Sequence, residues 1–290
     1  MNKRKLQISN GHYLQFDQLA RILHAINLFP ADRKITMSYL EEDTGLPFRQ
    51  VRNRISIARA LGIFEKKALR LTPIGSLVST YDPFFEMKGT LEYIHYMAAG
   101  NYLNLIWFEV FNTLLPQEPP SDYHGWIQYF QKSLKNDYTE HSLKDHLPKE
   151  LRFLIDAYIN KGFNKLELLN QTSDGKLFRR RYANIDLSVF CAILLDYASK
   201  QRTKLLQVED LLDNAGAPGL LFALDGNTLK SILEILHKKE YIRYESTHSL
   251  NQIRIKNDVD PMKFFESYYK AEEFHKNNLK NLNIENKSKQ

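Results

Sequence analysis

The chain has 290 residues, 43% of them hydrophobic and 26% charged, a composition that excludes an intrinsically disordered protein and allows a sizeable core. Its formal net charge is +6 and its pI is about 9.1, which fits a polyanionic partner without requiring one. The single cysteine, Cys191, excludes a disulfide framework or a thiolate metal site within one chain. No stretch approaches the roughly 18 apolar residues of a membrane span, and the N-terminus lacks the apolar run of a signal peptide. We therefore expect a soluble, cytoplasmic protein.

The first part of the chain predicts a polar lead-in followed by a helix. Residues 1–14 are mostly polar. Apolar residues then recur on one face of residues 16–29, and Pro30 ends the helix that this pattern predicts.

Residues 37–71 have the pattern of a helix-turn-helix followed by a wing. A short helix is expected over residues 37–43, Gly45 can take the left-handed conformation that ends a helix, and Pro47 suits a first helical turn. In the second helix, one buried stripe is predicted by apolar residues spaced four, three and three apart: Val51, Ile55, Ala58 and Leu61. Gly62 ends this helix, and two short strands with a basic tip are expected over residues 63–71.

The face opposite this stripe carries the residues that we expect to contact DNA. The N-terminal half of a second helix of this kind lies at the base edges, so Arg52 and Asn53 are expected to read bases, while residues further along contact phosphates. Residues 48–70 contain seven basic residues and one acid, a net charge of +6. The candidate DNA-binding residues are Arg49, Gln50, Arg52, Asn53, Ser56, Arg59, Lys66, Lys67 and Arg70.

The rest of the chain predicts a helical middle and a second module. Thr72 and Pro73 begin a capped helix, and the middle is rich in helical patterns with an aromatic stripe typical of a core. Asp174 and Gly175 predict a hairpin turn. Next to it, Arg179, Arg180 and Arg181 form either a solvated turn edge or a second phosphate contact.

From residue 186 onward the order of helices followed by two alternating strands resembles another winged helix. Its local charge is mixed, so a protein contact is as good an interpretation as DNA binding. A last helix is expected from Asp260 to about Lys270. We therefore expect a mainly α chain with small β wings: a winged helix-turn-helix DNA-binding domain over residues 1–80, a helical middle domain over 81–183, a winged-helix-like module over 184–272 and a disordered tail over 273–290.

The sequence contains none of the catalytic signatures that we sought: a phosphate-binding glycine loop, a nucleophile elbow or an HExxH pair. Asp82, Glu86 and Lys88 have the residue types of a metal-dependent nuclease centre, but we interpret this match as chance because such centres need carboxylates that converge on one cation. We expect no enzyme activity, no cofactor and no metal.

Several segments, taken in order, resemble the DUF4007 family, a prokaryotic domain of unknown function. They include Gly45-Leu-Pro, Val51-Arg52, Gly62-Ile-Phe, Leu71-Thr-Pro-Ile-Gly75, Asp82-Pro-Phe, Ala217-Pro-Gly219, Phe222-x-Leu224 and Asp260-Pro-Met-x-Phe264. The resemblance implies a component of bacterial anti-phage islands near DNA sulfur-modification genes, with a phosphoadenosine-phosphosulfate-reductase-like enzyme or another defence protein as partner. It supplies no catalytic residues.

Together these patterns favour a non-catalytic adaptor that binds double-stranded DNA in a phosphorothioation-like modification or restriction system. An interaction scaffold in that system and a winged-helix transcriptional regulator are the alternatives. The oligomeric state and the DNA sequence stay open.

Overall fold

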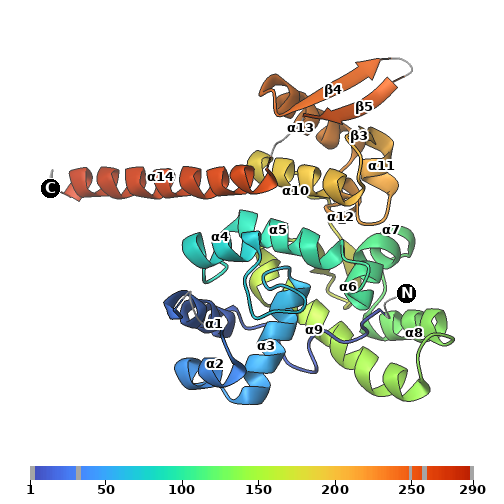
Figure 1. The fold of residues 1–290 in the computed structure, drawn as a ribbon. Helices are drawn as coiled ribbons and strands as arrows, with labels where there is room; N and C mark the ends of the chain where they lie inside the picture. The colour runs from blue at the N-terminus through green and yellow to red at the C-terminus, as the bar shows by residue number, and fades with distance from the viewer. Residues whose placement is uncertain (1–3, 31–33, 248–249, 257–259, 288–290) are drawn as a thin grey trace.

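The computed structural model describes residues 4–30, 34–247, 250–256 and 260–287, with side chains described as far as residue 275 (Figure 1). The fold is mainly helical with two small antiparallel sheets, as the sequence predicts at this level. No helix in these ranges is long and apolar enough to cross a membrane.

The N-terminal helices begin and end close to the predicted residues. Thr36 caps the second of them by accepting a hydrogen bond from the Tyr39 N–H, and Gly45 ends it at a φ of 65°. Thr72 caps the fourth through the N–H of Gly75. The four helices are α1 (Phe16–Leu28), α2 (Met37–Thr44), α3 (Phe48–Ala60) and α4 (Pro73–Tyr81).

The middle of the chain is helical and ends in the predicted hairpin, which is confirmed. Its aromatic stripe is core: Trp107, Phe111, Trp126 and Phe130 are buried. The helical elements are α5 (Lys88–Ala99), α6 (Leu105–Glu109), η1 (Val110–Leu114), α7 (Leu115–Gln117), α8 (Tyr123–Leu134), η2 (Ser142–His146), α9 (Leu147–Ile159) and η3 (Gly162–Leu166). Strands β1 (Leu169–Gln171) and β2 (Leu177–Arg179) pair antiparallel.

The C-terminal elements include a three-stranded sheet in the order β3-β5-β4, with β3 pairing antiparallel to β5. The last two strands of this sheet are predicted by the sequence, and β3 is not. The elements are α10 (Leu187–Lys200), β3 (Leu205–Gln207), α11 (Val208–Asp213), α12 (Pro218–Leu221), α13 (Gly226–Lys238), β4 (Ile242–Thr247), β5 (Leu250–Ile255) and α14 (Pro261–Lys287).

Helix α14 is longer than predicted. The sequence predicts an end of this helix near Lys270 and disorder over residues 273–290. Instead, α14 continues to Lys287 and projects from the body of the molecule (Figure 1). No glycine or proline follows Pro261, so nothing in the backbone breaks the helix. Residues 288–290 lie outside the described residues.

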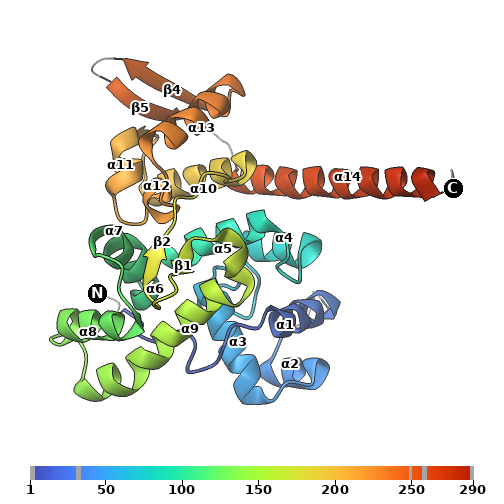
Figure 2. The same ribbon diagram turned by 180° about the vertical axis from the view of Figure 1, so that it is seen from behind.

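The elements form a connected body. Helices α10 and α14 lie over α4 and α5, and α1–α3 and α8–α9 lie on the other side (Figures 1 and 2). Buried apolar side chains form one cluster that runs from Leu6 to Tyr269. Within it, the Phe16 ring of α1 stacks on Phe85 with a centroid distance of 4.5 Å and contacts Phe163 edge-on. The predicted boundaries at residues 80 and 183 therefore fall inside a continuous core.

The N-terminal lead-in is a structural part of this body. Residues 4–15, which we call the N-terminal strap, run between α3 and α9 (Figures 1 and 2). Glu150 of α9 is fully buried and accepts hydrogen bonds from the backbone N–H of Ser9 at 3.1 Å and from its hydroxyl at 2.8 Å. At the start of the strap, the Lys5 N–H donates a hydrogen bond to the Leu103 carbonyl, and the Lys5 carbonyl accepts one from the Leu105 N–H. The strap is thus fastened to the middle of the chain.

Arg54 fastens the other side of the strap to α3. Its side chain is buried, and its guanidinium donates to the Tyr13 carbonyl at 2.7 Å, to the side-chain oxygen of Gln15 and to that of Gln18 at 2.7 Å. Burial lowers the pKa of this group, while the charge of Asp17 opposes the shift. A buried guanidinium is tolerated here because neutral acceptors surround it.

We predict that Arg54→Met lowers the free energy of unfolding by about 2–4 kcal/mol, since three buried or half-buried acceptors lose their donor. The matched control is Arg52→Met, two residues away on the exposed surface, which should change it by at most about 0.5 kcal/mol. Urea unfolding followed by circular dichroism measures both. Similar small effects for the two variants would contradict the buried placement of Arg54.

A second prediction concerns pH. Burial raises the pKa of Glu150 to about 7 from 4.5, while hydrogen bonds from Ser9 oppose the shift. A folded-state pKa above the unfolded value means that the folded state holds the proton more tightly. The contribution of Glu150 to stability is therefore present below pH 4.5 and is lost as the pH rises to about 7.

Glu150→Gln cannot ionise but can still accept from Ser9, so its Tm should fall less than that of the wild type between pH 5 and pH 8. The difference should be a few degrees, because 1 kcal/mol moves Tm by about 2–4 °C in a domain of this size. Calorimetry across this range measures it, and parallel Tm profiles for the two proteins would rule out the buried carboxyl.

Candidate nucleic-acid interface

The predicted helix-turn-helix segment has well-satisfied ends. Glu41 of α2 accepts a hydrogen bond at 3.0 Å from the N–H of Phe48, the first residue of α3. Leu40, Val51 and Ile55 are buried between α1, α2 and α3. These contacts set the two helices at the turn around Gly45, and they leave the N-terminal half of α3 at the surface.

Arg49 and Arg52 occupy that exposed half, as predicted, and Gln50 beside them is half-buried. Neither arginine has a hydrogen bond or ion pair within the described part of the chain. The surroundings of Arg49 are positively charged. Burial lowers the pKa of the nearby His12, and the charges of Arg54 and Arg49 lower that pKa further. This end of α3 can therefore attract an anion.

The middle of α3 differs from the prediction. Asn53 was expected to point outward to a base, but it is only 5% exposed, and its Oδ1 accepts a hydrogen bond from the Asn10 amide at 3.2 Å. The Ser56 hydroxyl donates to the Ile8 carbonyl at 3.3 Å. The strap therefore covers the part of the predicted DNA-binding face that carries Asn53 and Ser56. The exposed placement of Asn53 was wrong because the strap, not solvent, lies against this turn of the helix.

The predicted wing is a loop rather than a pair of strands. Phe64 and Leu71 form a single antiparallel bridge, and no strand is present over residues 63–71 of the described chain. Arg59 was expected to contact phosphate. Instead its guanidinium donates to the backbone carbonyls of Glu65 at 3.1 Å and Ala68 at 3.3 Å and so holds the loop. The strands fail to extend because these carbonyls bond to a side chain instead of to a partner strand.

Two lysines at the loop tip stay free while Arg70 does not. Arg70 forms a bidentate ion pair with Glu65, at 2.7 and 3.1 Å. Lys66 and Lys67 are exposed, and neither has a hydrogen bond or ion pair among the residues that the structure describes. Of the seven basic residues within residues 48–70, four are thus both exposed and unpaired: Arg49, Arg52, Lys66 and Lys67. Arg54, which the segment charge of +6 included, is buried.

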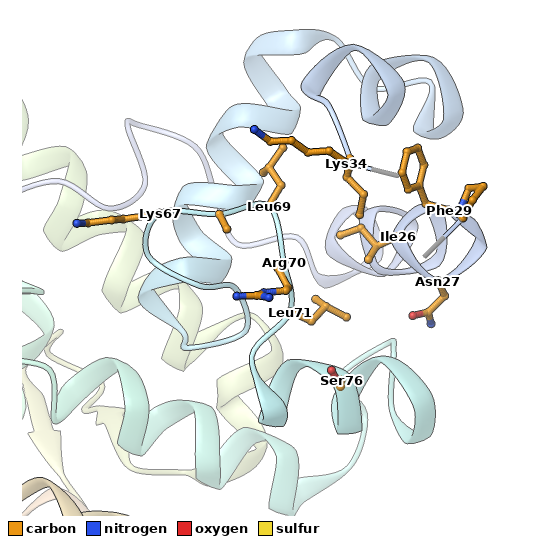
Figure 3. Close-up of a pocket in the computed structure, with 12 residues that line it drawn as sticks. Ile26, Asn27, Phe29, Lys34, Lys67, Leu69, Arg70, Leu71 and Ser76 are labelled. Atoms are coloured by element: carbon orange, nitrogen blue, oxygen red, sulfur yellow. The ribbon is translucent and has the colours of Figure 1, made fainter. Parts of the chain in front are cut away.

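An open groove of about 1030 Å³ lies beside the loop, between the C-terminal end of α1 and α4 (Figure 3). Figure 3 shows the charged ends of Lys34, Lys67 and Arg70 on one side of the groove, with Ile26 and Leu71 on the other. The groove extends the positive surface of the loop toward α1. The groove has no signal in the sequence, because it joins segments that are about forty residues apart in the chain.

The second candidate phosphate contact, Arg179 to Arg181, is occupied by intramolecular partners. Arg179 is half-buried and donates to the Leu220 carbonyl at 2.8 Å, and burial lowers its pKa. Arg180 pairs with Glu167 and Arg181 with Asp225, each at 3.1 Å. The two exposed pairs are weak, so this spot favours the interpretation of a solvated turn edge over that of a phosphate contact.

Two of the three residues with nuclease-like chemistry, Asp82 and Lys88, have side chains with structural roles. Both oxygens of Asp82, which is buried, accept backbone N–H bonds, from Glu86 at 2.8 Å and from Met87 at 2.9 Å. Lys88 donates to the Asn184 carbonyl at 3.3 Å and lies over the Tyr182 ring. Among the described residues, no group of three or more His, Cys, Asp or Glu side chains could hold a metal ion.

Two further titratable residues of α5 are also committed to the core. Glu92 accepts a hydrogen bond from the Tyr182 hydroxyl at 2.5 Å, and burial raises its pKa to about 8. His95 donates from Nε2 to the Leu221 carbonyl at 3.2 Å and accepts at Nδ1 from Tyr158, while burial lowers its pKa to about 3. A histidine with such a pKa is neutral, so His95 joins α5 to α9 and α12 as an uncharged bridge.

Two solved structures are similar to this chain. The magnesium ion-bound SspB crystal structure has a TM-score of 0.73 and 12% sequence identity, and the match covers 91% of this chain and 87% of that chain. An SspB crystal structure has a TM-score of 0.70 and 13% identity, with coverages of 92% and 87%. At these identities the similarity concerns the fold alone. A search of the curated proteins found no match.

The resemblance seen in the sequence motifs is confirmed by a family model described as protein of unknown function (DUF4007), which matches residues 57–269. The match begins within α3 and ends in α14, so it takes in the loop tip, the helical middle and the C-terminal sheet. Because this range is well over half of the chain, the protein belongs to the DUF4007 family.

Proposed function

We propose that this protein binds duplex DNA through phosphate contacts made by Arg49 and Arg52 of α3 and by Lys66 and Lys67 of the following loop. The observation that carries the proposal is that these four cations are exposed and unpaired, whereas the other basic residues of the segment are buried or bonded. Cations held in this way can release counterions from DNA, which is the main source of affinity in sequence-independent binding.

The docking that we propose is shallower than that of a classical helix-turn-helix. An α-helix enters the major groove when its outer face is free. The strap lies against α3 at Asn53 and Ser56, so only the first turns, with Arg49 and Arg52, can approach base edges. Arg52 is then the one base-reading candidate that the sequence analysis named and that is still exposed on this helix.

The proposal includes two winged-helix modules. The first is α2 and α3 with a loop in place of a regular wing. For the second, support comes from the element order α10, β3, α11, α12, α13, β4, β5 and from the sheet order β3-β5-β4. The helix α13 has Lys230 paired with Glu234, and Asp225 at its start pairs with Arg181. This balanced charge favours a protein contact for the second module over DNA binding.

The wider role that we propose is that of an adaptor in a bacterial DNA sulfur-modification or anti-phage system. Family membership supports this, together with the gene neighbourhoods that the family resemblance implies, including a phosphoadenosine-phosphosulfate-reductase-like partner. An interaction scaffold and a transcriptional regulator are the alternative functions. Duplex binding by the purified protein separates the adaptor from the scaffold, and a palindromic site in the protein's own promoter would support the regulator.

We predict that the wild type binds a random duplex with an affinity that falls steeply with salt. The double variant Lys66→Ala/Lys67→Ala should lower the slope of log K against log salt by about 2, because each lost phosphate contact removes about 0.9. Lys238→Ala, an exposed lysine of α13, is the matched control and should leave the slope unchanged. Fluorescence anisotropy at several salt concentrations measures these slopes.

The same titration is run with and without Mg²⁺, because a similar SspB structure holds that ion. Cleavage of the labelled duplex that requires Mg²⁺ would add a catalytic function to the binding proposed. If the double variant and the wild type have equal affinity and slope, the exposed cations do not contact DNA and the scaffold becomes the better proposal.

Arg52 and the lysines should differ in specificity. Arg52→Ala should cost about 1–3 kcal/mol at a preferred site and relax the preference at one base pair, as expected for an arginine that contacts guanine with two hydrogen bonds. Lys66→Ala should weaken all duplexes alike. Selection from a random duplex library, with phosphorothioated and unmodified probes in parallel, measures both effects. A uniform loss for Arg52→Ala would assign Arg52 to phosphate.

A further inference from the structure

A second, smaller pocket lies at the back of the loop tip, where four separate segments meet. Its walls come from the strap, from the C-terminal half of α3, from the loop at Lys66 and Lys67, and from residues 101–104 between α5 and α6. Its volume is about 370 Å³. This is within the range of small-molecule sites, roughly 300–1,000 Å³, and too small for a duplex.

All the charge on these walls is positive. Lys5, Arg59, Lys66 and Lys67 line the pocket, and no carboxylate does. The backbone of Lys5 is held on both sides, by Leu103 at 2.8 Å and by Leu105 at 3.1 Å, while its side chain is exposed. Arg59 is anchored by two of its five N–H groups, which leaves others for a ligand. Hydrogen bonds thus fix the Lys5 backbone and the Arg59 guanidinium, and the four cations together suit an anion.

Neutral groups complete the lining. Asn101 accepts at its side-chain oxygen from the Leu103 N–H at 3.1 Å, so its amide NH₂ stays available as a donor. The Ser56 hydroxyl donates its proton to the Ile8 carbonyl, so its oxygen can still accept a hydrogen bond from a ligand. Ile8, Ala60 and Leu103 supply apolar wall. Such a combination of cations, one amide donor and an apolar wall matches a phosphate that is joined to a sugar and a base.

We propose that this pocket binds a nucleoside phosphate. The phosphate lies between Lys5, Lys67 and the anchored Arg59, and the base or sugar packs on Ile8 and Leu103. Two sources share this chemistry, a free mononucleotide and the phosphorylated end of a DNA strand. The inference goes beyond duplex binding and does not rest on it, since Lys5 and Asn101 belong to the pocket but not to the proposed duplex-binding surface.

The test is calorimetric titration of the full chain with nucleoside 5′-monophosphates, with the matching phosphate-free nucleosides as the ligand control. Monophosphates should bind saturably and nucleosides much more weakly. Lys5→Ala keeps the backbone bonds of the strap and should weaken monophosphate binding about tenfold, as expected for the loss of one charge-assisted hydrogen bond. Lys67→Ala is the second variant and should act in the same direction, whereas Lys238→Ala should bind as the wild type does.

Competition then identifies the source. Displacement of the mononucleotide by a 5′-phosphorylated oligonucleotide, but not by a closed circular duplex, would assign the pocket to strand ends. Displacement by neither DNA would assign it to free nucleotide. The inference is overturned if no monophosphate binds at millimolar concentration, or if Lys5→Ala and Lys67→Ala both bind like the wild type. Duplex affinity, measured separately, distinguishes this failure from a failure of the proposed function.

Discussion

The buried Arg54 guanidinium is the interaction on which the arrangement of the N-terminal region depends. It lies inside the protein because the Tyr13 carbonyl and the Gln15 and Gln18 side chains accept its hydrogen bonds, and those acceptors are drawn onto α3 in return. A buried charge without such partners would be strongly destabilising. Glu150 holds the same strap from the opposite side through Ser9. The strap is therefore fastened to α3 on one side and to α9 on the other, and it covers part of α3.

This enclosure changes what α3 can do. In a helix that reads DNA, the outer face is free along its N-terminal turns, and here only Arg49 and Arg52 keep that freedom. The strap covers Asn53 and Ser56, yet it also supplies Lys5 and Ile8 to the pocket behind the loop. The strap thus covers part of the proposed DNA-binding surface and forms part of the smaller pocket. Both the DNA-binding surface and the pocket include Lys66 and Lys67. The loop tip is therefore the place where both duplex DNA and a nucleoside phosphate would bind under the two proposals.

The core around α5 explains why the three predicted parts share one body. Glu92 bonds to Tyr182 in the segment before α10, and His95 bonds to Leu221 of α12 and to Tyr158 of α9. These contacts are polar and fully buried, so separating the parts would expose them without their partners. The apolar cluster that runs from Leu6 to Tyr269 has the same consequence. The predicted boundaries follow changes in local pattern, whereas the packing crosses them.

What the sequence determined by itself is local. The ends of α2, α3 and α4 were predicted from Gly45, Pro47 and Thr72, because capping and left-handed turns depend on neighbours within a few residues. The buried stripe of α3 and the hairpin at Gly175 were predicted from periodicity and turn chemistry for the same reason. The tertiary structure alone decided which polar residues face solvent. Asn53 and Arg54 have the residue types of surface positions, but the strap covers them. Strand β3 forms only by pairing with β5, about fifty residues later in the chain. Arg179, Arg180 and Arg181 each bond to a residue that is distant in the sequence. Contacts between residues far apart in the chain leave no periodic signal, so the burial of a charged or amide side chain is settled by packing and not by the pattern around it.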